Sequence, residues 1–485
     1  MVCSAPMRSL RDRLLAPTDA APLAWFRLVF GVTMMVEVYR YFSRGWIEGY
    51  YIEPTFFFSY YGFDWINPWP GHGMYVHFAA LGVLGAMIAV GFCYRAAAPL
   101  FWLGVTYVFL LDQTHYLNHM YLVCLLAFLL IWLPGGEAFA LDTRLGWARP
   151  RGTVPAWMLW LVRGQIGLVY FFGGIAKLES DWLSGVPGAM FLSQREFTAP
   201  LAQLEWASRM FALSGAAFDL LVVPGLLWRR SRPWAIAAAV CFHLTNARLF
   251  QIGIFPWLML AVTPVFFEPR TVRRWLEWLW PWREPVAKAK ASKASPKAKA
   301  SPKAKASPKV NEPPKAKELP VNPAWARAGL VFFGLWLAFQ VLVPLRHWLY
   351  PGEVNWTEEG HNFSWHMKLR NKSGMVRFYG RDPRTGERWK IDPRPLLTER
   401  QYQKMTTRPD LVLQFAHELA RRYEQEGRPG VEIYADARAS LNGRPRQPMV
   451  DPEVDLASQA WTWRHSPWIT SLSSEPLAFS PPDST

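Results

Sequence analysis

Long apolar runs separated by polar segments constrain this chain more than any other feature. Of its 485 residues, 51% are hydrophobic and 27 are Trp. A helix that crosses a membrane needs about 20 consecutive apolar residues. Runs near that length occupy residues 23–42, 74–93, 97–111, 120–133, 156–176, 211–228, 234–250, 251–267 and 328–345. The sequence therefore predicts a polytopic α-helical membrane protein with about nine transmembrane helices.

Basic residues concentrate in alternate loops between these runs. They precede the first run, follow the second, separate the fourth from the fifth and the sixth from the seventh, and follow the eighth. Cytoplasmic loops of membrane proteins are enriched in Lys and Arg. We therefore expect these loops in the cytoplasm and the chain after residue 346 on the extracytoplasmic side.

Much of the net charge of +16 lies in one low-complexity tract, with ten Lys between residues 288 and 317. Such a tract cannot bury enough apolar surface to order itself, and it has no aromatic residues to stack on bases. We expect a linker held near membrane lipid and no nucleic-acid partner. The predicted organisation is a transmembrane helical domain at 1–270, a disordered cytoplasmic linker at 271–327, a last transmembrane helix at 328–346, an extracytoplasmic domain at 347–450 and an extended tail at 451–485.

The segment after residue 346 changes to a polar, alternating pattern. Strand-like alternation covers 363–369, 375–379, 388–391 and 431–435, and apolar spacing predicts a helix over 398–426. A turn is expected at 371–374. These signals predict a small α+β domain, mainly antiparallel β.

Three polar clusters lie at the ends of apolar runs, and these ends should be on the same side of the membrane. They are residues 112–119, the segment that begins at Lys177, and residues 243–248. Polar groups at the edge of a membrane bundle often line a functional site, although the first cluster could also be a simple polar turn. Inside the first run, Arg27 and Glu37 are expected to form an ion pair. The four Cys have neither a disulfide framework nor metal-ligand spacing, so no metal site is expected.

Several of these motifs resemble one known family. Residues 110–122, which read LLDQTHYLNHMYL, resemble a conserved stretch of the vitamin K-dependent γ-glutamyl carboxylases. Residues 170–182, 242–253, 355–360 and 440–444 are similar to further segments of that family, in the same order. The likeness covers about residues 20–270, as an HTTM-like transmembrane domain, and residues 328–456.

The resemblance implies an enzyme that oxidises vitamin K hydroquinone to its epoxide with O₂. In this family that oxidation drives CO₂ addition to protein-bound Glu. The partners implied are membrane lipid, an isoprenoid quinone and a Glu-containing peptide or protein. Two other functions fit the same scaffold: a related quinone- or lipid-modifying membrane enzyme, and a non-catalytic membrane protein that binds a quinone or a partner.

The resemblance and the three clusters together define the candidate site residues. The family's base Lys falls on Gln113, and an amide cannot act as a general base at neutral pH. His115, His119 and Lys177 could take over the role, and Gln113→Lys is expected to raise hydroquinone oxidation. The candidate catalytic residues are Gln113, Asn118, His119, Lys177, His243 and Asn246, with Gln113, His119 and His243 in one pocket. The candidate contacts for the acceptor peptide are Trp356, His361 and Trp365.

Overall fold

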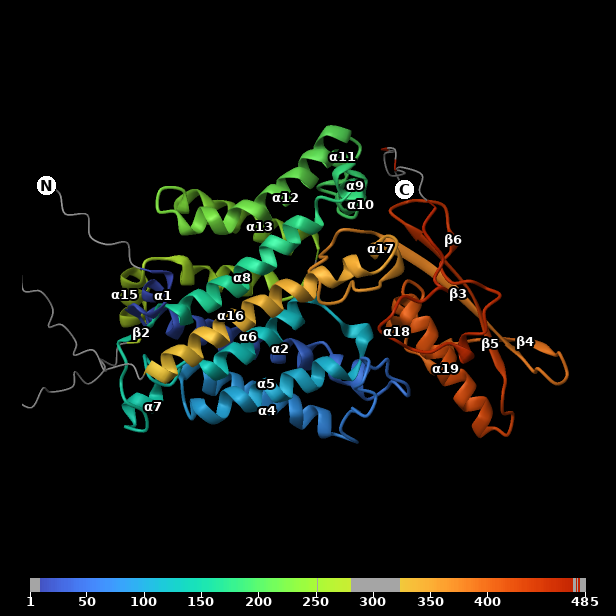
Figure 1. Ribbon diagram of the computed structural model, residues 1–485, viewed down its shortest axis with the longest axis horizontal. Helices are drawn as coiled ribbons and strands as arrows, with labels where there is room; N and C mark the ends of the chain where they lie inside the picture. Colours follow the sequence, from blue (N-terminus) through green and yellow to red (C-terminus); the bar gives the residue numbers. More distant parts are fainter. Residues whose placement is uncertain (1–8, 251, 281–322, 474–476, 478, 480–485) are drawn as a thin grey trace, which may run out of the picture.

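The computed structural model describes residues 9–250, 252–280, 323–473, 477 and 479, which form a helical bundle and a C-terminal domain. The two parts lie end to end along the long axis of the molecule (Figure 1). Helix α15 (Pro269–Leu279) and the start of α16 (Pro323–Leu345) lie at the end of the bundle far from the C-terminal domain. The linker expected at 271–327 thus overlaps both helices, and its Lys-rich tract lies outside the described residues.

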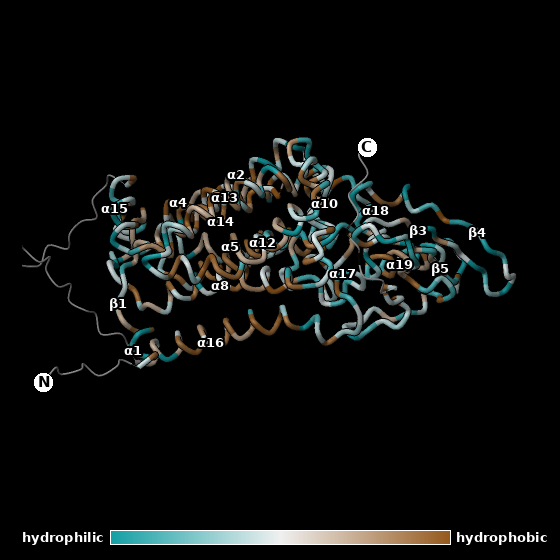
Figure 2. Tube along the Cα trace, turned by 90° about the horizontal axis from the view of Figure 1, so that it is seen from above, coloured by the Kyte–Doolittle hydropathy of each residue, from teal (hydrophilic) through white to brown (hydrophobic). Residues whose placement is uncertain are grey.

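Apolar helices build the bundle, and hydrophobic residues dominate it in Figure 2, whereas the C-terminal domain is more hydrophilic. Besides α15 and α16, the main helices are α2 (Ala21–Ser43), α4 (Gly73–Val90), α5 (Tyr94–Leu111), α6 (Asn118–Trp132), α8 (Ala156–Ala176), α12 (Glu205–Leu227), α13 (Arg232–Leu249) and α14 (Phe255–Val262). Shorter elements are α1 (Leu10–Leu15), β1 (Pro17–Asp19), α3 (Trp46–Tyr51), η1 (Gln113–His115), α7 (Leu141–Arg144), β2 (Thr153–Pro155), α9 (Ser180–Leu183), α10 (Val186–Ser193), α11 (Ala199–Ala202) and η2 (Thr263–Phe266).

The expectation of nine transmembrane helices is not confirmed. Within the described residues, six helices are long and apolar enough to cross a membrane: α2, α4, α5, α8, α12 and α16. Helix α6 has 15 residues and spans about 22 Å, short of the ~30 Å hydrocarbon core. The run at 251–267 yields only the short apolar helix Phe255–Phe266. Helix α13 is less apolar than these six, because it carries Arg232, His243, Asn246 and Arg248.

Small residues bring α2 and α4 into close contact at the centre of the bundle. A Cβ atom added to Gly31 of α2 would lie 2.5 Å from the carbonyl oxygen of Gly85 in α4 and 2.6 Å from the backbone nitrogen of Ala89. Any side chain at position 31 would therefore force the two helices apart. Small residues at such crossings are typical of helix packing in membranes.

The expected ion pair between Arg27 and Glu37 is wrong. Both side chains are buried, but ten residues separate them along one helix by about 15 Å. The Arg27 guanidinium donates to backbone carbonyl groups, including that of Phe139 at 2.7 Å. Glu37 instead pairs with Arg40, one turn further along α2.

The C-terminal domain is a four-stranded antiparallel sheet with the order β4-β3-β5-β6. Its strands are β3 (Lys372–Arg381), β4 (Arg388–Ile391), β5 (Glu432–Leu441) and β6 (Gln447–Pro448). Its helical elements are η3 (Arg346–Leu349), α17 (Val354–Thr357), η4 (Arg394–Leu396), α18 (Glu399–Met405), α19 (Pro409–Gln425) and η5 (Leu456–Ser458). Helix α19 packs on β5, and Phe378, Phe415 and Ile433 are fully buried between helix and sheet.

The sequence predicts most of this domain but misplaces its first segment. Strands at 375–379, 388–391 and 431–435 are confirmed, and β3 begins at Lys372, inside the expected turn. The helix expected over 398–426 is interrupted before Pro409, which lacks a backbone N–H and begins α19. Residues 363–369 form a loop instead of a strand. Its residues Phe363, Trp365 and Lys368 have positive φ angles of 67°, 62° and 53°, which no strand contains.

The two parts of the molecule share a hydrophobic core. Phe58, from the loop between α3 and α4 of the bundle, is fully buried in the core of the C-terminal domain. Phe56 packs edge-on against Phe415 of α19, with ring centroids 5.9 Å apart. The loop thus fixes the C-terminal domain at one end of the bundle, where the candidate site lies.

Candidate functional site

The site is built around residues 112–119, which connect α5 to α6. Asp112 follows α5 and caps η1 by accepting a 2.7 Å hydrogen bond from the backbone N–H of Thr114. Its other oxygen accepts a 2.8 Å bond from Nε2 of Gln401 in α18. Burial raises the pKa of the Asp112 carboxyl group to about 6, although these donors oppose the rise. The bond to Gln401 ties the bundle to the C-terminal domain.

Both polar atoms of the Gln113 side chain, Nε2 and Oε1, form hydrogen bonds. Its Nε2 donates to the carbonyl of Ser59 at 3.1 Å. Its Oε1 accepts from Nδ2 of Asn362 at 3.1 Å and from the guanidinium of Arg408 at 2.7 Å. The residue is 5% exposed. Gln113 therefore joins a bundle loop to two segments of the C-terminal domain, and these contacts define which way its amide points.

A strained loop of the C-terminal domain lies against residues 112–119. The backbone N–H of Phe363 donates to the hydroxyl of Tyr116 at 2.7 Å, and Nδ2 of Asn118 donates to the carbonyl of His366 at 3.2 Å. Residues with positive φ outside glycine are uncommon and concentrate at functional sites. Four such residues occur in this one loop: Glu358, Phe363, Trp365 and Lys368.

Lys177 follows the last turn of α8 and is buried. Its Nζ donates to Oδ2 of Asp219 in α12 at 2.5 Å and to the carbonyl of Gly173 at 3.1 Å. Both side chains of this ion pair are less than a tenth exposed, at 8% and 5%.

Two histidines of the bundle flank the same phenyl ring. His119, at the start of α6, and His243, in α13, each have their ring centroid 6.1 Å from that of Phe255. Nε2 of His243 lies 2.7 Å from the hydroxyl of Tyr170 in α8. Nδ1 of His243 is buried without a hydrogen-bond partner among the described residues. If neutral His243 carries its proton on Nε2, it donates to the Tyr170 oxygen and no buried N–H group is left unpaired. The hydroxyl hydrogen of Tyr170 can then be donated to another group.

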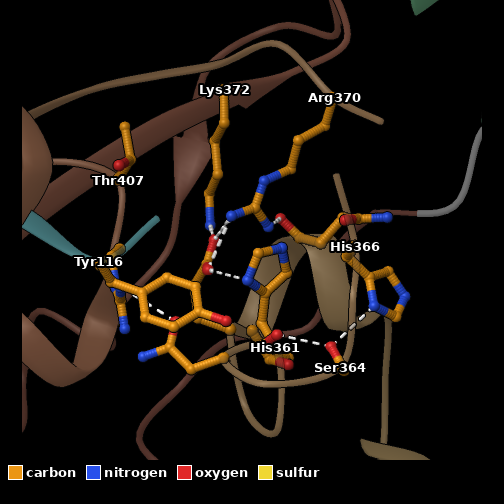
Figure 3. Close-up of polar contacts among 12 residues, drawn as sticks. Tyr116, His361, Ser364, His366, Arg370, Lys372 and Thr407 are labelled. Atoms are coloured by element: carbon orange, nitrogen blue, oxygen red, sulfur yellow. Dashed lines mark hydrogen bonds and ion pairs between the residues drawn. The ribbon is translucent and has the colours of Figure 1, made fainter. Parts of the chain in front are cut away.

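The Glu358 carboxylate holds together the C-terminal side of the site. Figure 3 shows Lys372, Arg370 and His361 converging on one carboxylate, which belongs to Glu358. Although burial opposes ionisation, the cations of Arg370 and Lys372 hold the pKa of Glu358 well below its usual range. Burial and the charge of Arg370 lower the pKa of His361 well below its usual value, so its ring is neutral at pH 7.

Most of these groups line one cavity of about 800 Å³ at the junction of the two parts, whereas Asp112 and Lys372 lie behind its wall. The lining includes the three predicted clusters and several cations from the C-terminal domain. The predicted residues among its walls are Gln113, Asn118, His119, Lys177, His243, Asn246 and His361. Within the described part of the chain, no group of three or more His, Cys, Asp and Glu side chains is arranged to hold a metal ion.

Two models of known families match this chain. Residues 15–270 match the model of the HTTM domain, and residues 325–475 match that of the vitamin K-dependent gamma-carboxylase lumenal domain. The chain belongs to the vitamin K-dependent γ-carboxylase family. No solved structure matches it. Membership and the six candidate spans establish a multi-pass membrane protein, and the family is one of enzymes. The side of the membrane on which each loop lies stays a prediction.

Two of the three residues that the sequence predicts to contact an acceptor peptide do not line the cavity. Trp356 is fully buried in the core of the C-terminal domain, where its Nε1 donates to the carbonyl of Thr470 at 2.7 Å. Trp365 is also fully buried and packs against Tyr121 of α6, with ring centroids 5.1 Å apart. Of the three predicted peptide contacts, only His361 lines the cavity.

The sequence analysis missed important residues of the cavity. Asp219, the partner of Lys177, carried a usable signal, because it is an acid inside the apolar run 211–228. Arg400, Lys404 and Arg408 carried no such signal, because charged residues in the helical part of a polar domain usually face solvent. Only the folded structure turns these three side chains toward the bundle.

Proposed function

We propose that this protein oxidises vitamin K hydroquinone with O₂ and uses that oxidation to add CO₂ to the γ-carbon of protein-bound Glu. The observation that carries the proposal is the shared cavity, in which Lys177, His119 and His243 of the bundle meet His361 of the C-terminal domain. Family membership supplies the class of reaction. The cavity supplies a place where a lipid-soluble and a peptide substrate could meet.

The lining of the cavity suits a lipid quinol. Phe218, Phe242 and Phe255 of the bundle offer apolar contact to an aromatic ring. The Tyr170–His243 and Lys177–Asp219 pairs add polar groups at separate points of the same wall. A volume of about 800 Å³ is within the range of small-molecule sites. Vitamin K hydroquinone, when bound, supplies the electrons for O₂ reduction and the strong base that removes a γ-hydrogen from Glu.

Lys177 is the residue that accepts the hydroxyl proton in this proposal. The adjacent Asp219 carboxylate, 2.5 Å from the Nζ atom, is the acceptor for the proton that Lys177 must lose to act as a base. The carbonyl of Gly173 accepts a second N–H and fixes the direction of the amine. Gln113 cannot serve, because an amide is not a base at neutral pH and its oxygen already accepts from Arg408. His119 and His243, which flank the Phe255 ring, position the substrate in this proposal.

The acceptor Glu enters from the side of the C-terminal domain. The loop that carries His361 and Asn362 forms part of the cavity wall and hydrogen-bonds to residues 113–118. A peptide bound to this domain therefore has a short path for one side chain into the cavity. Burial of the reaction at the junction also protects a strong base from water.

The experiment uses the full chain in lipid nanodiscs with vitamin K hydroquinone, O₂, labelled CO₂ and a Glu peptide. Epoxide and fixed label are scored separately. Lys177→Met should lower both by about 10²–10⁴-fold, the usual contribution of a general base, while quinone binding persists. Lys390→Met, at an exposed position in β4, is the matched control. An active Lys177→Met variant would remove Lys177 as the base, and a wild type that forms no epoxide would overturn the proposed function.

A further inference from the structure

A group of cations from the C-terminal domain faces the bundle across the cavity. Arg400 and Lys404 are four residues apart on one face of α18, and Arg408 follows at the same spacing before α19. All three line the cavity, and so does Lys368 of the strained loop. We call these four residues the basic cluster.

Most of the basic cluster has no carboxylate partner among the described residues. Arg408 pairs with Asp410 at 2.9 Å. Arg400 donates to Nδ1 of His115 at 3.0 Å, and the Nζ of Lys368 lies 5.7 Å from the ring centroid of Phe250. No protein hydrogen bond or ion pair reaches the Nζ of Lys404 within the described chain.

The carboxylates of the cavity wall cannot neutralise these charges, because each is already paired. Glu37 pairs with Arg40, Asp219 with Lys177, and Glu358 with Arg370. Arg400, Lys404 and Lys368 therefore form no ion pair in the described structure. The nearby Asp112 carboxylate, whose raised pKa the charge of Arg400 opposes, is hydrogen-bonded to Gln401 and is not part of the cavity wall. Charges interact more strongly in a cavity than in bulk water, so this surplus favours an anionic ligand.

Lys404 lies at the centre of the surplus. Burial and the nearby charges of Arg400, Arg408, Arg370 and Lys368 together lower the pKa of Lys404 to about 8. The same neighbours that repel its ammonium would attract an anion bound beside it. A carboxylate ligand therefore stabilises the Lys404 ammonium group, and a second negative charge on the ligand does not weaken this attraction.

We propose that the basic cluster is a carboxylate receptor that binds the dicarboxylate side chain of the product more tightly than the monocarboxylate of the substrate. The inference rests on the proposed function, which converts Glu into γ-carboxyglutamate. One carboxylate leaves part of the surplus positive charge uncompensated, whereas two carboxylates on one carbon can contact two cations of the cluster together. The product is therefore held at the site, and its release is slower than that of unreacted substrate.

The test measures binding and not turnover. Three peptides of one sequence, with Gln, Glu or γ-carboxyglutamate at the acceptor position, are titrated into the full chain in nanodiscs at pH 7 and low salt. We expect affinity to rise in that order, by about tenfold or more for each added charge, because a hydrogen bond to a charged group is stronger than one between neutral groups. Lys404→Met should remove most of the preference for γ-carboxyglutamate and leave the Gln peptide unchanged.

Two further measurements keep the result independent of folding defects. Lys404→Arg keeps the charge and should keep the order of affinities, and Lys390→Met should match the wild type. In the wild type, the preference for γ-carboxyglutamate should shrink as the pH rises from 7 to 10, because Lys404 loses its proton; this shift needs no substitution. Equal affinity for the Glu and γ-carboxyglutamate peptides, or a preference that survives in Lys404→Met, would overturn the inference. The predicted order without any epoxide or fixed CO₂ would support the receptor and overturn the proposed function.

Discussion

The Oε1 atom of Gln113 accepts a 2.7 Å hydrogen bond from the guanidinium of Arg408, so the bundle and the C-terminal domain meet at this pair. Both residues are at most 8% exposed. A change on either side therefore alters the cavity wall and the junction at the same time.

Gln113→Lys should lower hydroquinone oxidation, contrary to the expectation from the sequence alone. The new ammonium would replace an acceptor with a second cation beside Arg408, and an unpaired buried charge costs several kcal/mol. We expect a loss of stability of about 2–4 kcal/mol, measured as a lower Tm in nanodiscs. Gln113→Glu, which can pair with Arg408 but places an oxygen against the Ser59 carbonyl, is the contrasting variant and should lose less stability than Gln113→Lys. A clear gain of epoxide with Gln113→Lys would restore position 113 as the site of the base.

Arg444→Lys should loosen the junction between the two parts. The Arg444 guanidinium holds both oxygens of Asp181, at 2.7 and 2.9 Å, and a Lys cannot reproduce this fork. We expect a loss of about 1–3 kcal/mol and faster proteolysis between α16 and β3. Arg446→Lys, at an exposed position two residues away, should behave as the wild type. Equal proteolysis rates for the two variants would mean that this ion pair does not hold the junction.

Glu179 should make the stability of the junction depend on pH. Burial, with the charges of Glu353 and Asp181, raises the pKa of Glu179 to about 8, against about 4.3 in an unfolded chain. The folded state therefore keeps a proton that the unfolded state has lost, and stability falls as the pH rises from about 4 to about 8. Glu179→Gln should flatten this slope and be more stable than the wild type at pH 8. Parallel slopes of Tm against pH for the two proteins would contradict the prediction.

Trp356→Ala should destabilise the C-terminal domain instead of weakening peptide contacts directly. The indole is fully buried and donates to the carbonyl of Thr470. Removal of a buried Trp typically costs about 3–5 kcal/mol. Thermal unfolding checks this loss, and Trp356→Phe should recover part of it. A stable Trp356→Ala variant with weakened peptide binding would return this residue to the substrate site.

The sequence predicts those parts of the molecule that depend on local pattern. The apolar runs predict the main helices, and alternation predicts three strands of the sheet. The pattern at 363–369 misleads, because Phe363 and Trp365 alternate with polar residues while their backbones take positive φ angles. Contacts with Tyr116 and Tyr121 stabilise that loop, and no local signal encodes them.

The sequence predicts that segments of the bundle meet at the candidate site. It does not predict how the C-terminal domain completes that site. Lys177 and His243 lie at or near the ends of apolar runs, so the side of the bundle that each one reaches could be inferred. The partners that define their chemistry, Asp219 and Tyr170, depend on which helices pack side by side. Arg408 lies 295 residues from Gln113 along the chain, beyond the reach of any pattern.

The burial of Phe58 in the C-terminal domain has a consequence for biosynthesis. A ribosome makes residue 58 several hundred residues before β5, yet the last-made domain needs that ring to complete its core. The Gln113 backbone N–H donates to the carbonyl of Phe58 at 2.7 Å, so the early loop is already held by the bundle when translation ends. The bundle can thus serve as a folding template for the domain that follows it. Expressed by itself, that domain would expose the apolar gap where Phe58 belongs and would depend on added bundle to close it.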